Sequence, residues 1–451
     1  MDPISLGILG LVALVLLIAF RIPIAYAMIL VGGVGIMTVN GPQLVMSQLK
    51  TLGWGVFSNY GLSVVPMFVL MGALASRAGL SQALFRGANA WLGWLRGGTA
   101  MAAISACAGF GAVCGSSLAT ASTMGKVALP ELRRFKYSGA LATGSLAAGG
   151  VLGILIPPSV VLIIYAVIVE ANIVTMFAAA MLPGILAVIL FILTIAIYVA
   201  IKPEAGPRHE GVDFAEFRDA TMGLIPVTVI FGLVLGGIYG GFFNPTPAAA
   251  VGVALVWIYG AFTRTIGIRE LIGSLKETAG TTGMIYLILL GAELMKIFMS
   301  RIGLPQATAE WMVGSGFSPM LVLILLLFAL IVLGCLMDSL SMILLVIPFF
   351  WPVLMELNGG TFQGAEGAGF GMSTEELKIW FGILALIVVE LGLITPPVGM
   401  NVFVISAMAE DTPMSETFKG VMPFFFAEVI RVAILLSFPA ITLWLPRLLS
   451  G

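Results

Sequence analysis

Two short stretches decide the fold: residues 153–159, Gly-Ile-Leu-Ile-Pro-Pro-Ser, and residues 392–399, Gly-Leu-Ile-Thr-Pro-Pro-Val-Gly. Each interrupts a long apolar segment, and in both a glycine lies about one helical turn before the first proline. Proline removes a backbone donor and clashes with the carbonyl one turn earlier, so a Pro-Pro pair is expected to break a membrane helix. Freed backbone groups persist in a bilayer only inside protein or beside a polar cavity. The pattern predicts two broken helices that line a binding site; the alternative is a packing kink at each proline pair.

The composition of the whole chain is that of a polytopic membrane protein. Of its 451 residues, 60% are apolar and 10% are charged, and the mean hydropathy is +1.12. An average soluble protein has about a quarter of its residues charged. Apolar blocks reach the length of about 20 residues that crosses a bilayer as a helix. We expect spans near residues 4–20, 24–40, 62–76, 138–169, 174–200, 221–240, 245–262, 278–299, 376–408 and 420–446.

Charge and motif content exclude several classes of function. A net charge of −1 without a basic stripe argues against nucleic-acid binding. The three cysteines lie in apolar stretches and indicate no disulfide framework. The sequence has no Walker motif, no nucleophile elbow and no His/Cys metal cluster. We therefore expect neither an enzyme nor an organic cofactor.

The distribution of Lys and Arg predicts the orientation. With the N-terminus outside, most basic residues fall on the cytoplasmic side, and the opposite orientation reverses that balance. Both termini are therefore expected on the outer side of the membrane. The segment 201–220 is expected to be a cytoplasmic linker.

A weak internal repeat is the most informative feature of the chain. Residues 76–80, Ser-Arg-Ala-Gly-Leu, recur as residues 300–304, Ser-Arg-Ile-Gly-Leu, and a re-entrant hairpin candidate and a Pro-Pro break follow each copy. An odd number of expected crossings separates the copies, which predicts inverted topology, as in many secondary transporters. The alternative is chance similarity between apolar segments. The first predicted repeat is 1–200 and contains hairpin 98–123 and broken helix 138–169. The second predicted repeat is 221–451 and contains hairpin 317–350, an outward insert at 357–373 and broken helix 376–408.

Hydroxyls and acids at the expected hairpin tips point to ion binding. The tips are Gly115-Ser116-Ser117 and Met337-Asp338-Ser339, and their oxygens are ligands that suit a hard cation. The alternative for such small residues is a helix-packing face. Acidic residues within apolar stretches are functional candidates: Asp338 is the strongest, and Glu390 divides evenly between functional and structural roles. Glu293 with Lys296 and Glu428 with Arg431 are spaced for ion pairs within a helix.

Segments 81–95 and 304–314 are expected to be interfacial helices on opposite faces, bracing a mobile domain against a fixed one.

With these residues in view, the chain resembles the large membrane (M, DctM-like) subunit of TRAP, the tripartite ATP-independent periplasmic transporters. The resemblance extends over essentially the whole chain. It rests on residues 115–125, Gly-Ser-Ser-Leu-Ala-Thr-Ala-Ser-Thr-Met-Gly, on Leu129-Pro130-Glu131, on both Pro-Pro stretches, and on Met337-Asp338, Pro348, Pro352, Phe381-Gly382 and Phe403-Val404. The family's usual short link after the second hairpin is replaced here by the insert 357–373.

The resemblance implies an elevator-type ion-transporter architecture with two Na+ sites, each where a hairpin tip meets its broken helix. It assigns Gly115, Ser116, Ser117, Gly153, Pro157, Pro158 and Ser159 to the first site. It assigns Asp338, Ser339, Gly392, Thr395, Pro396, Pro397 and Gly399 to the second. An organic anion between the tips would contact Ser117, Thr120, Ser341 and Asn401.

The resemblance also implies two partners, a small four-helix membrane (Q) subunit on a separate polypeptide and a periplasmic substrate-binding protein. The expected function is therefore a Na+-coupled importer subunit for a small carboxylate, such as a C4-dicarboxylate, keto acid or sugar acid. The alternatives are a stand-alone Na+/carboxylate symporter of the same architecture and, more remotely, a channel, a membrane enzyme, or a non-transporting scaffold or sensor.

Overall fold

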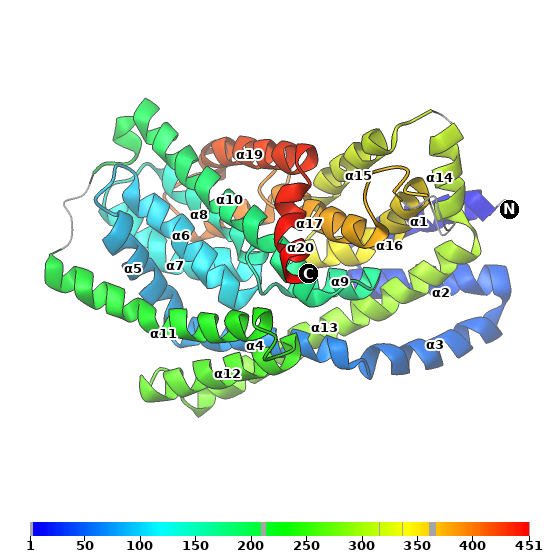
Figure 1. Ribbon diagram of the computed structural model, residues 1–451, viewed down its shortest axis with the longest axis horizontal. Coiled ribbons are helices and arrows are strands. Elements are labelled where there is room, and N and C mark those ends of the chain that lie inside the picture. The colour runs from blue at the N-terminus through cyan, green and yellow to red at the C-terminus, as the bar shows by residue number, and fades with distance from the viewer. Residues whose placement is uncertain (1–2, 209–212, 315, 336, 360–366, 451) are drawn as a thin grey trace.

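The computed structural model describes residues 3–208, 213–314, 316–335, 337–359 and 367–450, and these residues form helices joined by short turns. The helices lie in two groups (Figure 1). A frame layer contains α1 (Pro3–Ala19), α2 (Ile24–Asn40), α3 (Pro42–Phe57), η1 (Tyr60–Ser63), α4 (Val64–Arg77), α11 (Phe214–Tyr239), α12 (Pro245–Phe262) and α13 (Ile268–Arg301). Within it α13 packs along α2 and α4, and α12 packs on α4 and α11.

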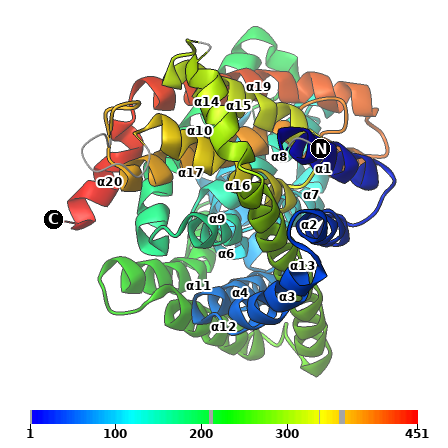
Figure 2. The same ribbon diagram turned by 90° about the vertical axis from the view of Figure 1, so that its right-hand side faces the viewer.

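The second group, the hairpin layer, contains both proline-rich breaks. Its members are α6 (Gly98–Cys114), α7 (Ser117–Arg134), α8 (Gly139–Leu155), α9 (Val160–Val169), α10 (Ile173–Ile201), η2 (Pro203–Ala205), α15 (Pro319–Gly334), α16 (Ser339–Leu357), α17 (Thr374–Gly392), α18 (Met400–Met408), α19 (Met414–Ser437) and α20 (Ala440–Ser450). Helix α8 is at its centre and packs against α6, α7 and α19. In Figure 2 the frame helices α3, α4, α11 and α12 lie below this group.

Two shorter helices connect the layers. Helix α5 (Leu80–Leu92) packs on α6 of the hairpin layer and on α11 of the frame layer. Helix α14 (Leu304–Gly314) packs on α16 and on α13 in the same way. They cover the segments expected to be interfacial helices, and each contacts both layers; their position at the membrane interface stays a prediction.

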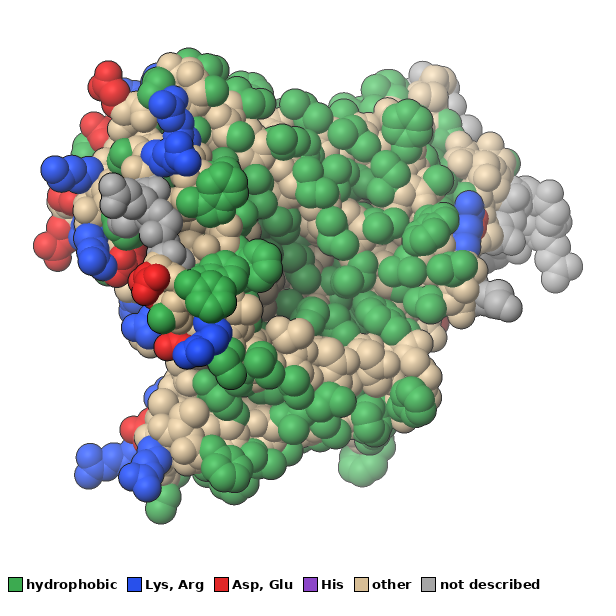
Figure 3. Space-filling view, turned by 60° about the vertical axis from the view of Figure 1, so that its left-hand side comes forward, with side chains coloured by type: hydrophobic (Ala, Val, Ile, Leu, Met, Phe, Trp, Pro, Cys, Tyr) green, Lys and Arg blue, Asp and Glu red, His purple; other side chains and the backbone are tan. Residues whose placement is uncertain are grey.

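The surface is that of a membrane protein. Seven described helices are long and apolar enough to cross a bilayer, and α8 with α9 forms a further span bent by 44°. The face in Figure 3 is covered mainly by hydrophobic side chains, and its Lys, Arg, Asp and Glu residues gather mostly at one end. Large apolar side chains such as Phe20, Ile201 and Phe262 are exposed. The chain is thus an all-α multi-pass membrane protein, as the composition predicted.

Both predicted hairpins and both predicted breaks are present. The hairpins are α6/α7 and α15/α16, and the breaks lie between α8 and α9 and between α17 and α18. The Pro157–Pro158 and Pro396–Pro397 bonds are both cis. The division into two repeats at 201–220 and their opposite orientation stay predictions. Residues 209–212 of the linker, 336 of the second hairpin, 360–366 of the insert and the extreme termini lie outside the described residues.

The helices differ from the expected spans in several places, including α11, which begins at Phe214 inside the expected linker 201–220. Helix α3 was not expected, because its apolar residues are mixed with polar ones; Trp54 and Phe57 are exposed on it. Helix α13 begins at Ile268 rather than near 278, since Glu270 accepts a hydrogen bond from the backbone of Gly267 and caps a polar first turn. The last expected span, 420–446, is divided into α19 and α20 at Pro439, where proline ends the helical hydrogen-bond pattern.

Candidate functional site

A cavity of about 410 Å³ lies between the two layers and is bordered by both hairpin tips. The frame layer contributes residues of α4 and α13, and the hairpin layer contributes residues of α6, α7, α8, α9 and α16. Five predicted site residues line it: Gly115, Ser116, Ser117, Asp338 and Ser339. The structure therefore brings together two segments that are more than two hundred residues apart in the sequence.

The first tip is shaped by a glycine between α6 and α7. Gly115 adopts a positive φ of 62°, and a Cβ there would lie 3.1 Å from the carbonyl oxygen of Pro158. Both observations require glycine at this position. Ser116 caps α7, and its hydroxyl accepts a hydrogen bond from the backbone N–H of Ala119 at 3.4 Å. Hence the tip of hairpin 1 contacts the Pro-Pro turn of its own half.

The first broken helix contacts the tip from the other side. A Cβ on Gly153 would lie 2.8 Å from the carbonyl oxygen of Ser116 and 2.5 Å from the hydroxyl oxygen of Thr120. After the break, Ser159 caps α9 by accepting from Leu162 N at 3.3 Å. Pro157, Pro158 and Ser159 are buried. In the first half the tip and the break therefore meet at two points, Gly115 against Pro158 and Ser116 against Gly153.

The second tip repeats this design with an acid in place of a hydroxyl. Asp338 caps α16, accepting from the backbone N–H of Ser341 at 3.1 Å and from its hydroxyl at 2.6 Å. Asp338 and Ser116 therefore have the same structural role, because each caps the helix that follows its hairpin tip. Ser341 is occupied by this bond and does not line the cavity.

The second break is more open than the first. Thr395 donates its hydroxyl proton to the carbonyl of Leu391 at 2.6 Å, so its oxygen keeps lone pairs for a ligand. Gly399 adopts a φ of 58° and is buried, whereas Pro396 and Pro397 are exposed. Gly392, at the end of α17, lies against the end of α15. The described contacts thus join the second tip to the end of α17 through Ser339 and Glu390, and residues 392–399 do not line the cavity.

Glu390 was not among the predicted ligands and does not line the cavity, yet it contacts both hairpin tips. Its side chain is fully buried, and its two carboxylate oxygens accept hydrogen bonds from Ser117 of the first tip and Ser339 of the second. The signal in the sequence was an acid inside an apolar run, two residues before Gly392. What the sequence did not reveal was its partners.

Of the four residues expected to contact the anion, Ser117 alone lines the cavity in the described part of the chain. Asn401 lies behind it and donates to the Ser117 hydroxyl at 3.3 Å. Thr120 Oγ1 and Asn401 Oδ1 are buried and have no hydrogen-bond partner among the described residues. These two oxygens remain available as acceptors beside the first break.

The charged residues of the cavity wall are Lys126, Glu277 and Asp338. Glu277 on α13 pairs with Arg77 on α4 at 3.3 Å, so its charge is shared within the frame layer. Lys126 on α7 has no carboxylate partner among the described ion pairs and is exposed. Ser76 of α4 and Thr123 of α7 also line the cavity, and their hydroxyl oxygens are 3.5 Å apart.

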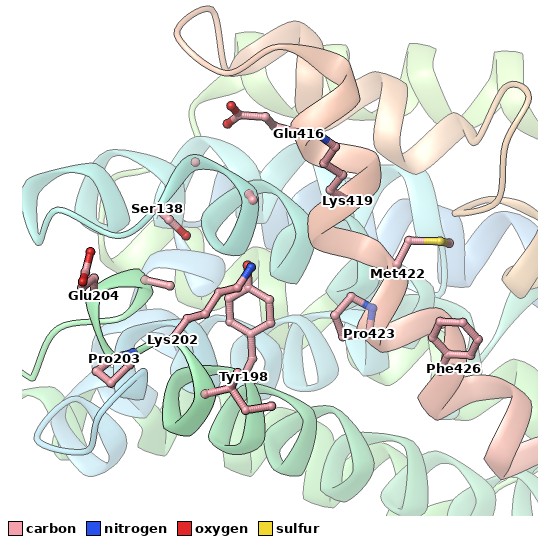
Figure 4. Close-up of a pocket in the computed structure, with 14 residues that line it drawn as sticks. Ser138, Tyr198, Lys202, Pro203, Glu204, Glu416, Lys419, Met422, Pro423 and Phe426 are labelled. Atoms are coloured by element: carbon pink, nitrogen blue, oxygen red, sulfur yellow. The ribbon is translucent and has the colours of Figure 1, made fainter.

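A second cavity, of about 1040 Å³, lies between α8, α10 and α19 (Figure 4). Its wall contains two lysines, Lys202 and Lys419, and two acids, Glu204 and Glu416, so its charges balance. None of the predicted site residues borders it. The cavity at the hairpin tips is therefore the candidate functional site.

Both predicted intrahelical ion pairs are confirmed. Glu293 and Lys296 on α13 are 3.9 Å apart and partly exposed. Glu428 and Arg431 on α19 are fully buried and paired, and Arg431 also donates to the carbonyl of Pro183 at 3.3 Å. A buried charge needs such a partner, because an isolated one is costly to remove from water.

Comparisons with known proteins agree with this architecture. A family model described as "Tripartite ATP-independent periplasmic transporter, DctM component" matches residues 11–441. Over 401 residues the chain is 34% identical to the C4-dicarboxylate TRAP transporter large permease protein DctM of Pseudomonas aeruginosa, with 87% of each chain covered. Over 436 residues it is 30% identical to the sialic acid TRAP transporter large permease protein SiaM of Vibrio cholerae, with 95% of this chain and 96% of that one covered.

Among solved structures, the YdaH transporter of Alcanivorax borkumensis is similar with a TM-score of 0.60 over 89% of each chain. The sequence identity is 14%, so this likeness concerns the fold.

Proposed function

Because the chain belongs to the DctM component family of the tripartite ATP-independent periplasmic transporters, and so is a transporter permease rather than an enzyme, we propose that it imports a small organic anion by Na+ symport. The observation that carries this proposal is that two hairpin tips border a single cavity. The first tip packs on the Pro157–Pro158 break, and the second is bonded through Ser339 to Glu390, near the end of α17. This arrangement suits one cargo anion held between two ion sites.

Oxygen chemistry supports Na+ as the coupled ion. The residues of both half-sites offer hydroxyls, a carboxylate and backbone at helix breaks, which are the groups that coordinate Na+ in transporters with broken helices. Thr120 Oγ1 and Asn401 Oδ1 add buried acceptors without partners among the described residues. We place one ion at Gly115–Ser117 and Gly153–Ser159, and the other at Asp338, Ser339 and residues 392–399.

The direction of the helices supports an anion between the tips. Helices α7 and α16 both begin at the cavity, at Ser117 and Ser339, and a helix N-terminus attracts negative charge. Lys126 adds a positive charge to the same wall. Na+ bound at the tips would complement the carboxylate, which couples the two cargoes.

Two layers joined by α5 and α14 suit an elevator mechanism. The frame layer would stay fixed while the hairpin layer, with one hairpin and one broken helix from each half of the chain, carries the site across the inner membrane. The contacts of α5 and α14 with both layers support this division. Both termini would lie in the periplasm.

The family works with a small membrane subunit and a periplasmic binding protein, and we propose both as partners here. The relatives named above carry C4-dicarboxylate and sialic acid, which are carboxylates, and we propose a carboxylate cargo delivered by the binding protein. The test is uptake of candidate acids into proteoliposomes that contain this chain and its small subunit under a Na+ gradient. Uptake that requires the binding protein supports the proposal, whereas equal uptake without it identifies a stand-alone symporter.

A further inference from the structure

Glu390 joins the two hairpin tips directly. It lies near the end of α17, and its side chain is fully buried. Ser117 donates to one carboxylate oxygen, Oε2, at 2.5 Å, and Ser339 donates to the other, Oε1. The two serines occupy the same position, because each directly follows the residue that caps its helix. One carboxylate thus binds equivalent groups of both half-sites.

The bridge continues into the first broken helix. Ser117 Oγ lies 3.0 Å from the carbonyl oxygen of Gly150 on α8 and accepts a hydrogen bond from Asn401 of α18 at 3.3 Å. Asn401 also reaches the carbonyl oxygen of Ala147 on α8 at 3.4 Å. The hydroxyl of Ser117 has one proton, and the charged acceptor forms the stronger bond. Glu390 therefore lies in a buried polar network that includes both tips and both broken helices.

We propose that Glu390 is a positioning residue that sets the spacing of the two tips and transmits ion occupancy from one half-site to the other. The inference rests on the Na+ symport proposed above. An ion that orders Ser117 also fixes Glu390, and Glu390 in turn fixes Ser339, so the second ion meets a tip that is already ordered. The second ion then loses less conformational entropy on binding, and this gives positive cooperativity without a large structural change.

The test uses Glu390→Gln in the full chain, reconstituted with its small subunit and binding protein. The amide keeps the size of the side chain, but it offers one acceptor oxygen instead of two, so one of the two serines loses its acceptor. Glu293→Gln is the matched control, because it also neutralises a carboxylate within a membrane helix, in the frame layer away from both tips.

The expected result is a change in the Na+ dependence of uptake. The Hill coefficient for Na+ should fall from about two to about one, since it reports interaction between sites. The Na+ half-saturation should rise roughly ten-fold, a shift that corresponds to about 1.4 kcal/mol. The control should keep both wild-type values. If Glu390 only stabilised the fold, its substitution would lower the amount of active protein but leave the Hill coefficient unchanged.

Glu390→Asp tests whether the bridge between the two serines or the negative charge alone is needed for cooperativity. The shorter side chain keeps its charge but cannot reach both hydroxyls, so cooperativity should also be lost in this variant. If Glu390→Asp behaves as wild type, or Glu390→Gln keeps the wild-type Hill coefficient, the inference is overturned. If Glu390→Gln fails to fold, Ser339→Ala removes the hydrogen bond between the second tip and Glu390 instead. An unchanged Hill coefficient in Ser339→Ala would also overturn the inference.

A second measurement makes no use of transport. Na+, compared with choline, should raise the melting temperature of the purified wild-type chain along a sigmoidal titration and that of Glu390→Gln along a hyperbolic one. Identical curves for the two proteins would overturn the inference. A wild-type protein that responds to Na+ neither in uptake nor in melting would instead refute the proposed function itself.

Discussion

Gly392 on α17 lies against Gly334 on α15 so closely that a Cβ on Gly392 would be 2.5 Å from the carbonyl carbon of Gly334. The first half has the corresponding contact, because a Cβ on Gly111 of α6 would be 2.4 Å from the Cα of Gly153 on α8. In each half, the first arm of the hairpin and the broken helix therefore meet without side chains between them, as close-packed membrane helices do at small residues.

We expect Gly392→Ala and Gly111→Ala to damage the site by separating these backbones. Forcing extra volume into such a contact typically costs about 1–3 kcal/mol. Both variants should therefore melt earlier and lose most of their uptake. Gly280→Ala on α13 is the matched control, since no heavy atom outside its own helix lies within 4 Å of the added carbon. Wild-type uptake in both Gly392→Ala and Gly111→Ala would show that these helix contacts do not shape the site.

Ser117→Ala and Thr395→Ala should each raise the Na+ half-saturation of uptake. Each removes one oxygen from a proposed ion site, and a loss of about 1 kcal/mol corresponds to roughly a five-fold change. Thr194→Ala on α10 is the control, because Thr194 makes the same bond to the carbonyl four residues earlier, at 2.7 Å, outside the site. The measurement is initial uptake against Na+ concentration at constant ionic strength. Unchanged Na+ dependence in both site variants would refute the placement of the ions.

Lys126→Gln should weaken the interaction with the anion and leave Na+ activation unchanged. Lys126 is the basic residue of the cavity wall, and its exposed charge attracts anions through water, so the apparent KM should rise about three-fold at low salt and less at high salt. Lys136→Gln, in the turn after α7, is the control. A KM that does not depend on Lys126 at any salt concentration would remove this residue from the anion pathway.

Fixing α4 to α7 should stop transport if the two layers move past each other. Ser76 Oγ and Thr123 Oγ1 are 3.5 Å apart, so cysteines at both positions lie within reach of one mercury ion. In a Cys114→Ser background, mercury should abolish uptake by the double variant, and excess thiol should restore it. Each single variant serves as a control. Continued uptake by the cross-linked protein would contradict an elevator movement at this interface.

Much of the architecture could be predicted from local sequence. The Pro-Pro pairs indicated where α8 and α17 end, because proline acts on its own helix whatever surrounds it. Ser116 and Asp338 were placed at hairpin tips, and both cap the helix that follows. The pairing of Glu428 with Arg431 followed from helical spacing alone.

The parts that could not be predicted depend on distant contacts. Ser117 and Glu390 are 273 residues apart, and only the fold brings them together. The open second break and the enclosed first one differ because of what packs around them, although their sequences are alike. The sequence did not predict helix α3, because its exposed aromatic residues are mixed with polar ones and form no continuous apolar block.

The most direct test of the symport mechanism measures both cargoes at once. Proteoliposomes that contain the chain, its small subunit and its binding protein would receive radioactive sodium outside, with and without a transported acid. The account predicts that the acid accelerates sodium entry, that sodium and acid enter in a fixed ratio, and that Ser117→Ala lowers both fluxes together at limiting Na+. Entry of the acid with no accompanying sodium would contradict it.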